Sequence, residues 1–192
     1  MRLVAFLLAG AVTASAQMPS PQDAESLDRK IQVIARHSTE SPSQARRTTV
    51  SEREVNAYLR YRVSSELPAG VTEPSVTLAG DGRLGGRALV DLDQVRRKQS
   101  SGGWLDPMSY LTGKLPVTVT GVLVSQKGSA QFKLESAEVG GVPMPKTLLQ
   151  EIVAYHTRSE AHPRGVSFEQ PFDLPAEIDH IEIGRGQAVV VQ

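Results

Sequence analysis

Three features of the sequence predict an α+β fold built from amphipathic helices and antiparallel strands. Apolar residues recur at helical spacing in three separate segments. Between the second and third of these segments, and again after the third, apolar and polar residues alternate as in strands with one wet face. Clusters of glycine and proline separate the two kinds of pattern. The length of 192 residues suits one domain.

The first 16 residues have the features of a cleavable signal peptide. Arg2 is followed by an apolar run over residues 3–12, which is too short to span a bilayer. Ala14-Ser15-Ala16 is a small-residue cleavage pattern, which predicts cleavage between Ala16 and Gln17. A retained anchor or a buried helix is the less favoured alternative. We therefore expect an exported protein, periplasmic or extracellular.

The mature chain is expected to consist of a flexible segment, residues 17–23, and one domain, residues 24–192. The full chain has 21 basic and 21 acidic residues, a balance that gives no long-range attraction to nucleic acid or anionic lipid. It has no cysteine, which excludes disulfides, thiol catalysis and cysteine metal ligands. No segment after the signal peptide is long and apolar enough to cross a membrane.

The first expected helix covers residues 24–37, where Leu27, Ile31 and Ile34 recur at helical spacing. Residues 38–48 are polar and contain a proline, so we expect a loop there. This first helix is short and amphipathic, and it needs an apolar surface to pack on.

A second helix is expected to begin at Ser51. Ser51 and Glu54 have the spacing of a capping box, and Pro68 and Gly70 end the segment. Its apolar stripe, with Tyr58 beside it, consists of Val55, Leu59 and Val63.

Two hairpins follow the second helix. Residues 75–92 alternate about the pair Asp81-Gly82, and residues 114–139 alternate about a turn at residues 126–128. Between them, residues 93–113 read as a connector. The alternation predicts a sheet with one apolar and one polar face.

An abrupt change of pattern follows the second hairpin. Gly140-Gly141 ends the strand, and Pro143 and Pro145 cannot donate to a sheet ladder. Pro145 suits the first position of a helix, whose apolar stripe we expect to pack on the sheet. The stripe consists of Leu148, Leu149, Ile152, Val153 and His156. Further strands are expected within residues 166–192, with a turn at residues 184–186.

The segment GDGRLG, residues 80–85, matches a dinucleotide-binding fingerprint. That function requires a helix to begin there, so that the helix N-terminus holds the pyrophosphate. The following residues alternate as in a strand instead. A hairpin turn without a nucleotide is therefore the prediction.

No catalytic site, metal or cofactor is expected. Asp91 and Asp93 offer too few oxygen ligands for calcium, so a cap or surface charge is favoured. The serines lie in none of the common hydrolase motifs. The basic residues 95–99 lack interleaved aromatic residues, so solvated charge is favoured over binding of phosphate or a lipid headgroup. The histidines, which lack zinc-ligand spacing and are expected on the surface, are His37, His156, His162 and His180.

Three segments carry a resemblance to a known family. They are TVSEREVNAYL (residues 49–59), GGVPMPKTLLQEIV (residues 140–153) and PFDLPAEIDHIEIGRGQAVVVQ (residues 171–192). They hold, in order, a helix start, a G-x-P-x-P helix start and an LP-x-x-I strand, with a hairpin between the first two. In this order they resemble exported envelope proteins of the lipomannan-elongation type, which are similar to the tubular lipid-binding superfamily. The resemblance implies a long, curved antiparallel sheet wrapped around two or three amphipathic helices in a single domain. It also implies that the protein binds a lipid or another apolar ligand outside the cytoplasm.

We therefore expect a non-enzymatic binding protein of the cell envelope whose ligand is a lipid or acyl chain. The residues expected to line its apolar groove are Val55, Leu59, Val63, Leu149, Ile152 and Val153. Ordinary core packing explains each of these residues equally well. An envelope structural or interaction module with a closed core and a protein partner is the alternative. A hydrolase with a site assembled from distant residues is a third, less supported class.

Overall fold

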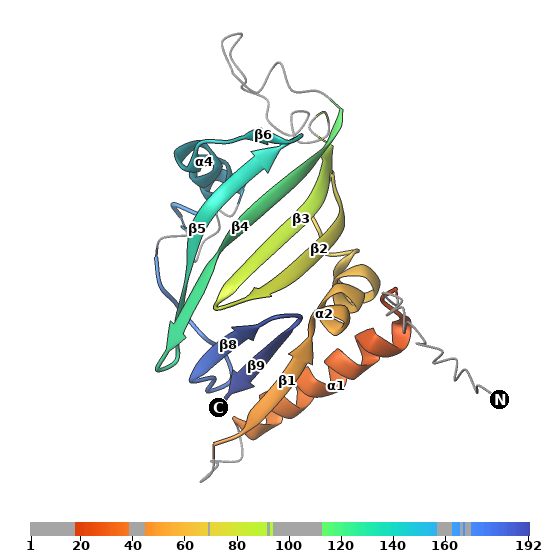
Figure 1. The fold of residues 1–192 in the computed structure, drawn as a ribbon, viewed down its shortest axis with the longest axis vertical. Helices are drawn as coiled ribbons and strands as arrows, with labels where there is room; N and C mark the ends of the chain where they lie inside the picture. The colour runs from red at the N-terminus through yellow and green to blue at the C-terminus, as the bar shows by residue number, and fades with distance from the viewer. Residues whose placement is uncertain are drawn as a thin grey trace, which may run out of the picture.

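The computed structural model describes residues 18–38, 45–68, 70–91, 93, 113–156, 163–165, 167 and 170–192. The predicted signal peptide, most of the predicted connector and the basic residues 95–99 lie outside the described residues. In the described part, helices and antiparallel strands occur together, with one large sheet (Figure 1). The predicted mixed class is confirmed, whereas the wrapping of the sheet around the helices remains a prediction.

Helix α1 (Pro21–His37) begins earlier than predicted. Its cap is Ser20, whose side-chain oxygen accepts a hydrogen bond from the backbone of Asp23, while the Asp23 carboxylate accepts from the Ser20 backbone. Pro21 occupies the first helical position, where its missing N–H costs nothing. The prediction of a flexible segment at residues 17–23 is therefore wrong from Ser20 onward.

The second helix begins as predicted but continues differently. In α2 (Glu52–Tyr58), Ser51 and Glu54 form the predicted capping box. The chain then widens into a π-helical turn, η1 (Leu59–Val63), which the sequence pattern did not indicate. Directly before α2 lies a strand, β1 (Arg47–Ser51), which was not predicted; its first two residues, Arg47 and Thr48, were expected to belong to a loop.

The larger sheet contains both predicted hairpins. The first turns at Asp81 and Gly82, with φ of 53° and 77°, and the second at Lys127 and Gly128, with φ of 50° and 78°. The GDGRLG segment is thus a turn between paired strands, as predicted. The strands in spatial order are β2 (Val71–Gly80), β3 (Arg83–Asp91), β4 (Lys114–Gln126), β5 (Ser129–Val139) and β6 (Val142–Pro143), with β7 (Phe172–Asp173) also paired to β5.

A smaller second sheet has the order β1-β9-β8, so the described strands do not form the single sheet that the resemblance implies. Its hairpin joins β8 (His180–Gly184) to β9 (Gln187–Val191) through the predicted turn. An isolated bridge between Ala79 and Arg185 and a hydrogen bond from the Ile181 backbone to Ser125 Oγ connect the two sheets.

The helices lie along the margins of the sheets. Figure 1 shows α1 alongside α2 and β1, α2 next to β2, and α4 (Lys146–His156) beside β5. Among the described residues, no large side chain is fully buried. Those that come closest are scattered between α1, α2 and the sheets, and include Leu27, Ile34, Val50, Leu78, Leu149 and Val191. The molecule therefore has a thin core.

Candidate functional site

The larger sheet has one apolar and one polar face. Residues directly opposite one another on paired strands point to the same side of a sheet. The register sets Leu84 opposite Gly121 and Val90 opposite Leu115, so alternate residues of β3 and β4 build a continuous apolar surface. Side chains of that face include Leu84, Val90, Val117, Val119, Leu123 and Leu134. The opposite face carries Arg83, Arg87, Thr118, Thr120, Lys133 and Glu138.

The apolar face is incompletely covered. All six of the apolar side chains named above are half-buried rather than buried. A sheet in a small domain normally buries its apolar face against another layer. The described residues therefore leave apolar surface accessible mainly on β3 and β4, whereas Ala130, Ala137 and Val139 on the same face of β5 are buried.

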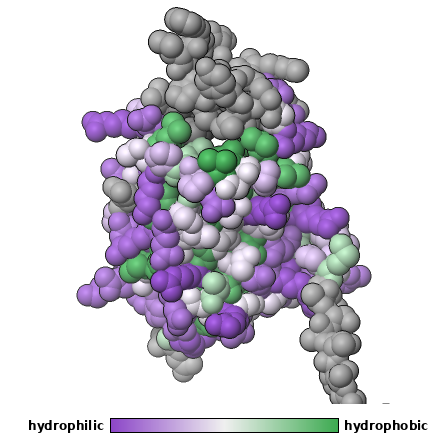
Figure 2. Space-filling model, turned by 45° about the horizontal axis from the view of Figure 1, so that its top comes forward, coloured by the Kyte–Doolittle hydropathy of each residue, from purple (hydrophilic) through white to green (hydrophobic). Residues whose placement is uncertain are grey.

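The outer surface also mixes polar and apolar regions. Figure 2 shows hydrophilic residues over most of the face in view and hydrophobic residues gathered in its upper half. The most exposed large apolar side chains in the described ranges, apart from Met18, are Val142 and Phe172, with 64% and 50% of their surface accessible. Both lie on short strands that pair with β5, at opposite ends of the edge that does not pair with β4.

The six residues predicted to line a groove fall into two separate groups. Val55 lies in α2, and Leu59 and Val63 lie in η1; all three are half-buried. In α4, Leu149 is buried and Val153 is half-buried, while the side chain of Ile152 is outside the described set.

The structure does not bring these two groups together. Helix α2 and η1 contact β2, whereas α4 contacts β5. Strands β3 and β4 lie between β2 and β5 in the sheet. A ligand that touches both groups must therefore cross the middle of the sheet.

A hollow of about 850 Å³ lies between the helix formed by α2 and η1 and the strands β2 and β3. The helix lines it with Asn56, Arg60 and Ser64, which form the stripe next to the predicted apolar one. The strands contribute Thr72, Ser75, Arg87 and Leu89, which belong to the polar face of the sheet. We call this space the α2–β2 hollow. Val71 and Ala88, which share the apolar face, also line it, so the hollow reaches that face at the β2 edge. The hollow was not predicted from the sequence.

A second hollow, of about 680 Å³, lies between α4 and β5. Lys146 at the start of α4 donates a hydrogen bond from Nζ to the Leu134 carbonyl oxygen, at 2.6 Å. The other lining side chains are mainly polar and include Gln131, Lys133, Gln150 and Glu151. Leu134 lines it as well, so this hollow offers both polar and apolar contacts.

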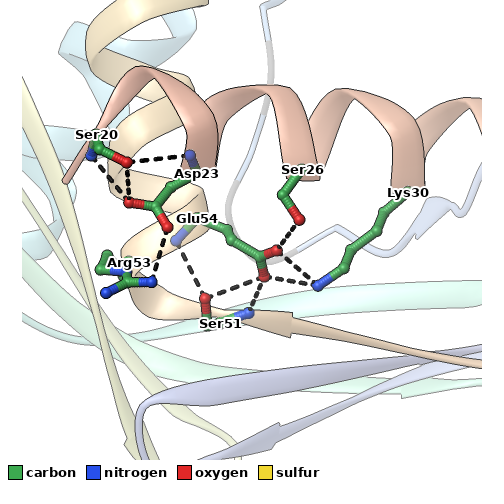
Figure 3. A network of polar contacts seen from close by, with 7 residues as sticks. All are labelled: Ser20, Asp23, Ser26, Lys30, Ser51, Arg53 and Glu54. Carbon is green, nitrogen blue, oxygen red and sulfur yellow. Dashed lines mark hydrogen bonds and ion pairs between the residues drawn. The ribbon is translucent and has the colours of Figure 1, made fainter.

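Glu54 is the only polar residue classed as buried in the described part of the chain, with 7% of its surface accessible. Lys30 Nζ lies 2.7 Å from both carboxylate oxygens, and Ser26 Oγ donates to Oε1 at 2.6 Å (Figure 3). The Ser51 backbone N–H donates to Oε2 at 2.8 Å. Burial alone would raise the pKa of Glu54, but these donors outweigh it and lower the pKa to about 2. The carboxylate therefore ties α1 to the start of α2.

A neighbouring ion pair supports the same helix contact. Arg53 lies 2.9 Å from the carboxylate of Asp23, which also accepts from Ser20 (Figure 3). The hydrogen bond from Ser20 is the main reason that the pKa of Asp23 is lowered, and Arg53 adds to it against the opposing effect of burial. These contacts stabilise the fold and do not form a reactive site.

His180 belongs to an exposed cluster on the smaller sheet. Its ring nitrogens lie 2.6 Å from Asp179 and 3.3 Å from Glu182, and Arg47 lies 2.6 Å from the other oxygen of Glu182. The hydrogen bond with Asp179, followed by that with Glu182, raises the pKa of His180. The pKa of Glu182 is lowered, chiefly by Arg47. This charge network links β1 to β8.

In the ranges that the structure describes, His, Asp and Glu side chains nowhere form a group of three or more that could hold a metal ion. Within the same ranges, no helix combines the length and hydropathy needed to span a membrane.

The fold and its surfaces define a mixed α and β protein with an accessible apolar sheet face and a polar hollow beside it. No protein-family model matches the chain, and no curated protein matches it significantly.

Proposed function

We propose that the chain is an exported, non-enzymatic protein that binds a lipid or another apolar ligand in the cell envelope. The observation that supports this is the apolar face of the larger sheet, on which six apolar side chains of β3, β4 and β5 are only half-buried. Each methylene buried against such a surface contributes about 0.8 kcal/mol. An acyl chain could therefore bind there without a charged partner.

In this proposal the apolar face is the floor of a groove, and the helices form its two sides. Helix α2 with η1 stands at the β2 edge and α4 at the β5 edge, with β3 and β4 between them (Figure 1). Curvature of the sheet between these helices would produce the wrapped arrangement that the resemblance implies. The two groups of residues predicted to bind ligand would then lie on opposite sides of one groove.

The test is a titration of delipidated protein with a fluorescent fatty acid. Val117 and Thr118 are consecutive half-buried residues that point to opposite faces of β4. We expect saturable binding that Val117→Asn weakens and that the matched control Thr118→Asn leaves unchanged. Circular dichroism checks that both variants remain folded. Absence of saturable binding, or equal losses in the two variants, would exclude the groove.

One observation favours the alternative of an envelope interaction module. Val142 and Phe172 are highly exposed on β6 and β7, which pair with opposite ends of β5, so each offers a separate apolar contact to a partner protein. Crosslinking in the native host followed by mass spectrometry would test it. The module is supported if no lipid co-purifies and a protein partner is lost on Val142→Asp or Phe172→Asp. Co-purified lipid with no such partner would contradict it.

A further inference from the structure

The α2–β2 hollow is framed by irregular backbone on both sides. On the helix side, Arg60 lies in the π-helical turn η1. On the sheet side, the register of β2 shifts between Thr72 and Ser75, and Glu73 within this bulge has a φ of 52°. A left-handed conformation is unfavourable for a residue other than glycine. Both π-turns and bulges are frequent at functional sites, because they re-aim side chains.

Two guanidinium groups line this hollow. Arg60 comes from η1 and Arg87 from the polar face of β3. Neither has a carboxylate partner in the described part of the chain, whereas Arg53, Arg62 and Arg83 are all ion-paired. Arginine presents a planar set of donors that matches the oxygens of phosphate. Arg60 also lies over the Tyr61 ring, 5.8 Å from its centroid. An anionic ligand would therefore meet two arginines here that have no carboxylate partner among the described residues.

The remaining lining residues restrict the kind of anion. Ser64 offers a hydroxyl, and Glu73 brings a carboxylate to the same hollow. A carboxylate repels a bare anion and accepts hydrogen bonds from hydroxyl or ammonium groups. The volume of about 850 Å³ falls within the range of small-molecule sites. A small phosphate ester that also carries hydroxyl or ammonium groups fits this lining better than inorganic phosphate does.

We propose that the α2–β2 hollow binds the phosphate of a hydroxyl- or amine-bearing phosphate ester through Arg60 and Arg87, with Glu73 accepting from the ester's own donors. Both phospholipid headgroups and free phosphate esters have this chemistry. Arg60 and Arg87 come from η1 and from the polar face of β3, so the site stands whether or not an acyl chain binds the apolar face. If the ligand is a phospholipid, the α2–β2 hollow would select its headgroup.

The experiment is isothermal titration calorimetry of the full mature chain with glycerol 3-phosphate and, separately, with inorganic phosphate. We expect glycerol 3-phosphate to bind more tightly than inorganic phosphate and to bind more weakly at high salt. Arg60→Gln and Arg87→Gln should each raise the dissociation constant about tenfold or more, since each removes hydrogen bonds to a charged group. The dissociation constant of Arg60→Lys should lie between those of the unaltered chain and Arg60→Gln, because lysine keeps the charge but lacks the planar donors.

Arg83→Gln is the matched control. Arg83 lies on the same strand and the same face as Arg87, is exposed, and does not line the hollow. An equal loss in this variant would show non-specific attraction to basic side chains and overturn the proposal, as would the absence of saturable binding in the unaltered chain. Thermal unfolding confirms that each variant is folded.

Short-chain phosphatidylglycerol distinguishes the two sources of phosphate. If it binds more tightly than glycerol 3-phosphate and the gain is lost in Val117→Asn, the ligand is a lipid headgroup. If the two bind equally, it is a free phosphate ester. Failure of the fatty acid titration alone would remove the proposed lipid function and leave the phosphate site intact.

Discussion

At the scale of single residues, Glu54 links α1 to α2 by hydrogen bonds. It accepts from Ser26 and Lys30 on the first helix and from Ser51 at the cap of its own helix. A buried carboxylate without such donors would be strongly destabilising. The sequence indicated only the local half of this arrangement, the pairing of Ser51 with Glu54.

Glu54→Gln should therefore change how stability depends on pH. The pKa of Glu54 is lowered on folding from 4.5 to about 2, which corresponds to on the order of 3 kcal/mol. Because the folded pKa is the lower one, this stabilisation is fully present above pH 4.5 and is lost as the pH falls toward 2. Urea unfolding across this range should show a shallower acid dependence in Glu54→Gln and a lower stability at neutral pH. Glu135→Gln, which removes an exposed carboxylate, is the control and should leave the acid dependence nearly unchanged.

Gly121 is a second residue whose identity matters. A Cβ at this position would lie 2.5 Å from the Phe132 ring and 2.5 Å from the Lys133 carbonyl oxygen. Gly121→Ala should cost about 1–3 kcal/mol, because backbone must shift to admit the methyl group. At Gly85 in the adjacent strand the nearest atom would lie at 3.5 Å, so Gly85→Ala should change stability by about 0.5 kcal/mol or less. Equal effects in thermal unfolding would contradict the close packing at Gly121.

At the scale of elements, α2 protects an edge strand. Asn56 donates from Nδ2 to the Val76 carbonyl oxygen at 2.8 Å and accepts from the Val76 N–H at 2.7 Å. One turn earlier, Glu52 accepts from the Leu78 N–H at 2.7 Å. These side chains take the place of a neighbouring strand along β2, which limits pairing with another molecule.

Asn56→Ala should expose this edge. We expect a loss of about 1–3 kcal/mol, because two backbone groups of Val76 lose their partners. Hydrogen exchange of the Val76 amide should become faster, while that of the Leu84 amide on β3 should follow only the change in global stability. An unaltered rate at Val76 would mean that water or another group replaces Asn56 without cost.

Local chemistry explains which elements were predictable. The turns at Asp81-Gly82 and Lys127-Gly128 and the cap at Ser51 depend on residues within a few positions of one another. Strand β1 does not depend on nearby residues. It is short and mostly polar, and it forms by pairing with β9, far along the sequence. The early start of α1 followed from a capping box of Ser20 and Asp23, in which aspartate replaces the usual glutamate or glutamine.

At the scale of the whole molecule, the candidate site was less predictable than the fold. The apolar stripe of Val55, Leu59 and Val63 stands out in the sequence, but the α2–β2 hollow is lined by the adjacent stripe of Asn56, Arg60 and Ser64. Polar residues on a helix do not by themselves indicate a cavity. The other wall of this hollow comes from β2 and β3, which lie further along the sequence. The division into two sheets depends on contacts of the same long-range kind.

The proposed export makes a prediction for the whole chain. Cleavage between Ala16 and Gln17 would leave every described helix and strand intact, because α1 begins at Pro21 and its cap is Ser20. N-terminal sequencing of material from the native host should therefore begin at Gln17. A chain of residues 17–192 should unfold at the same temperature as the full chain. Recovery of protein that still begins at Met1 would argue against the signal peptide.

The position of β9 in the smaller sheet also determines the order in which the protein can assemble. Strand β9 lies between β1 and β8, and the described strands offer β1 no other partner. Bringing β1 and β9 together closes a long loop, whereas the hairpins β2–β3 and β4–β5 close over two residues each. The hairpins should therefore form early and the smaller sheet last. During synthesis, β1 is made long before its partner β9, so its backbone should stay unpaired until β9 emerges.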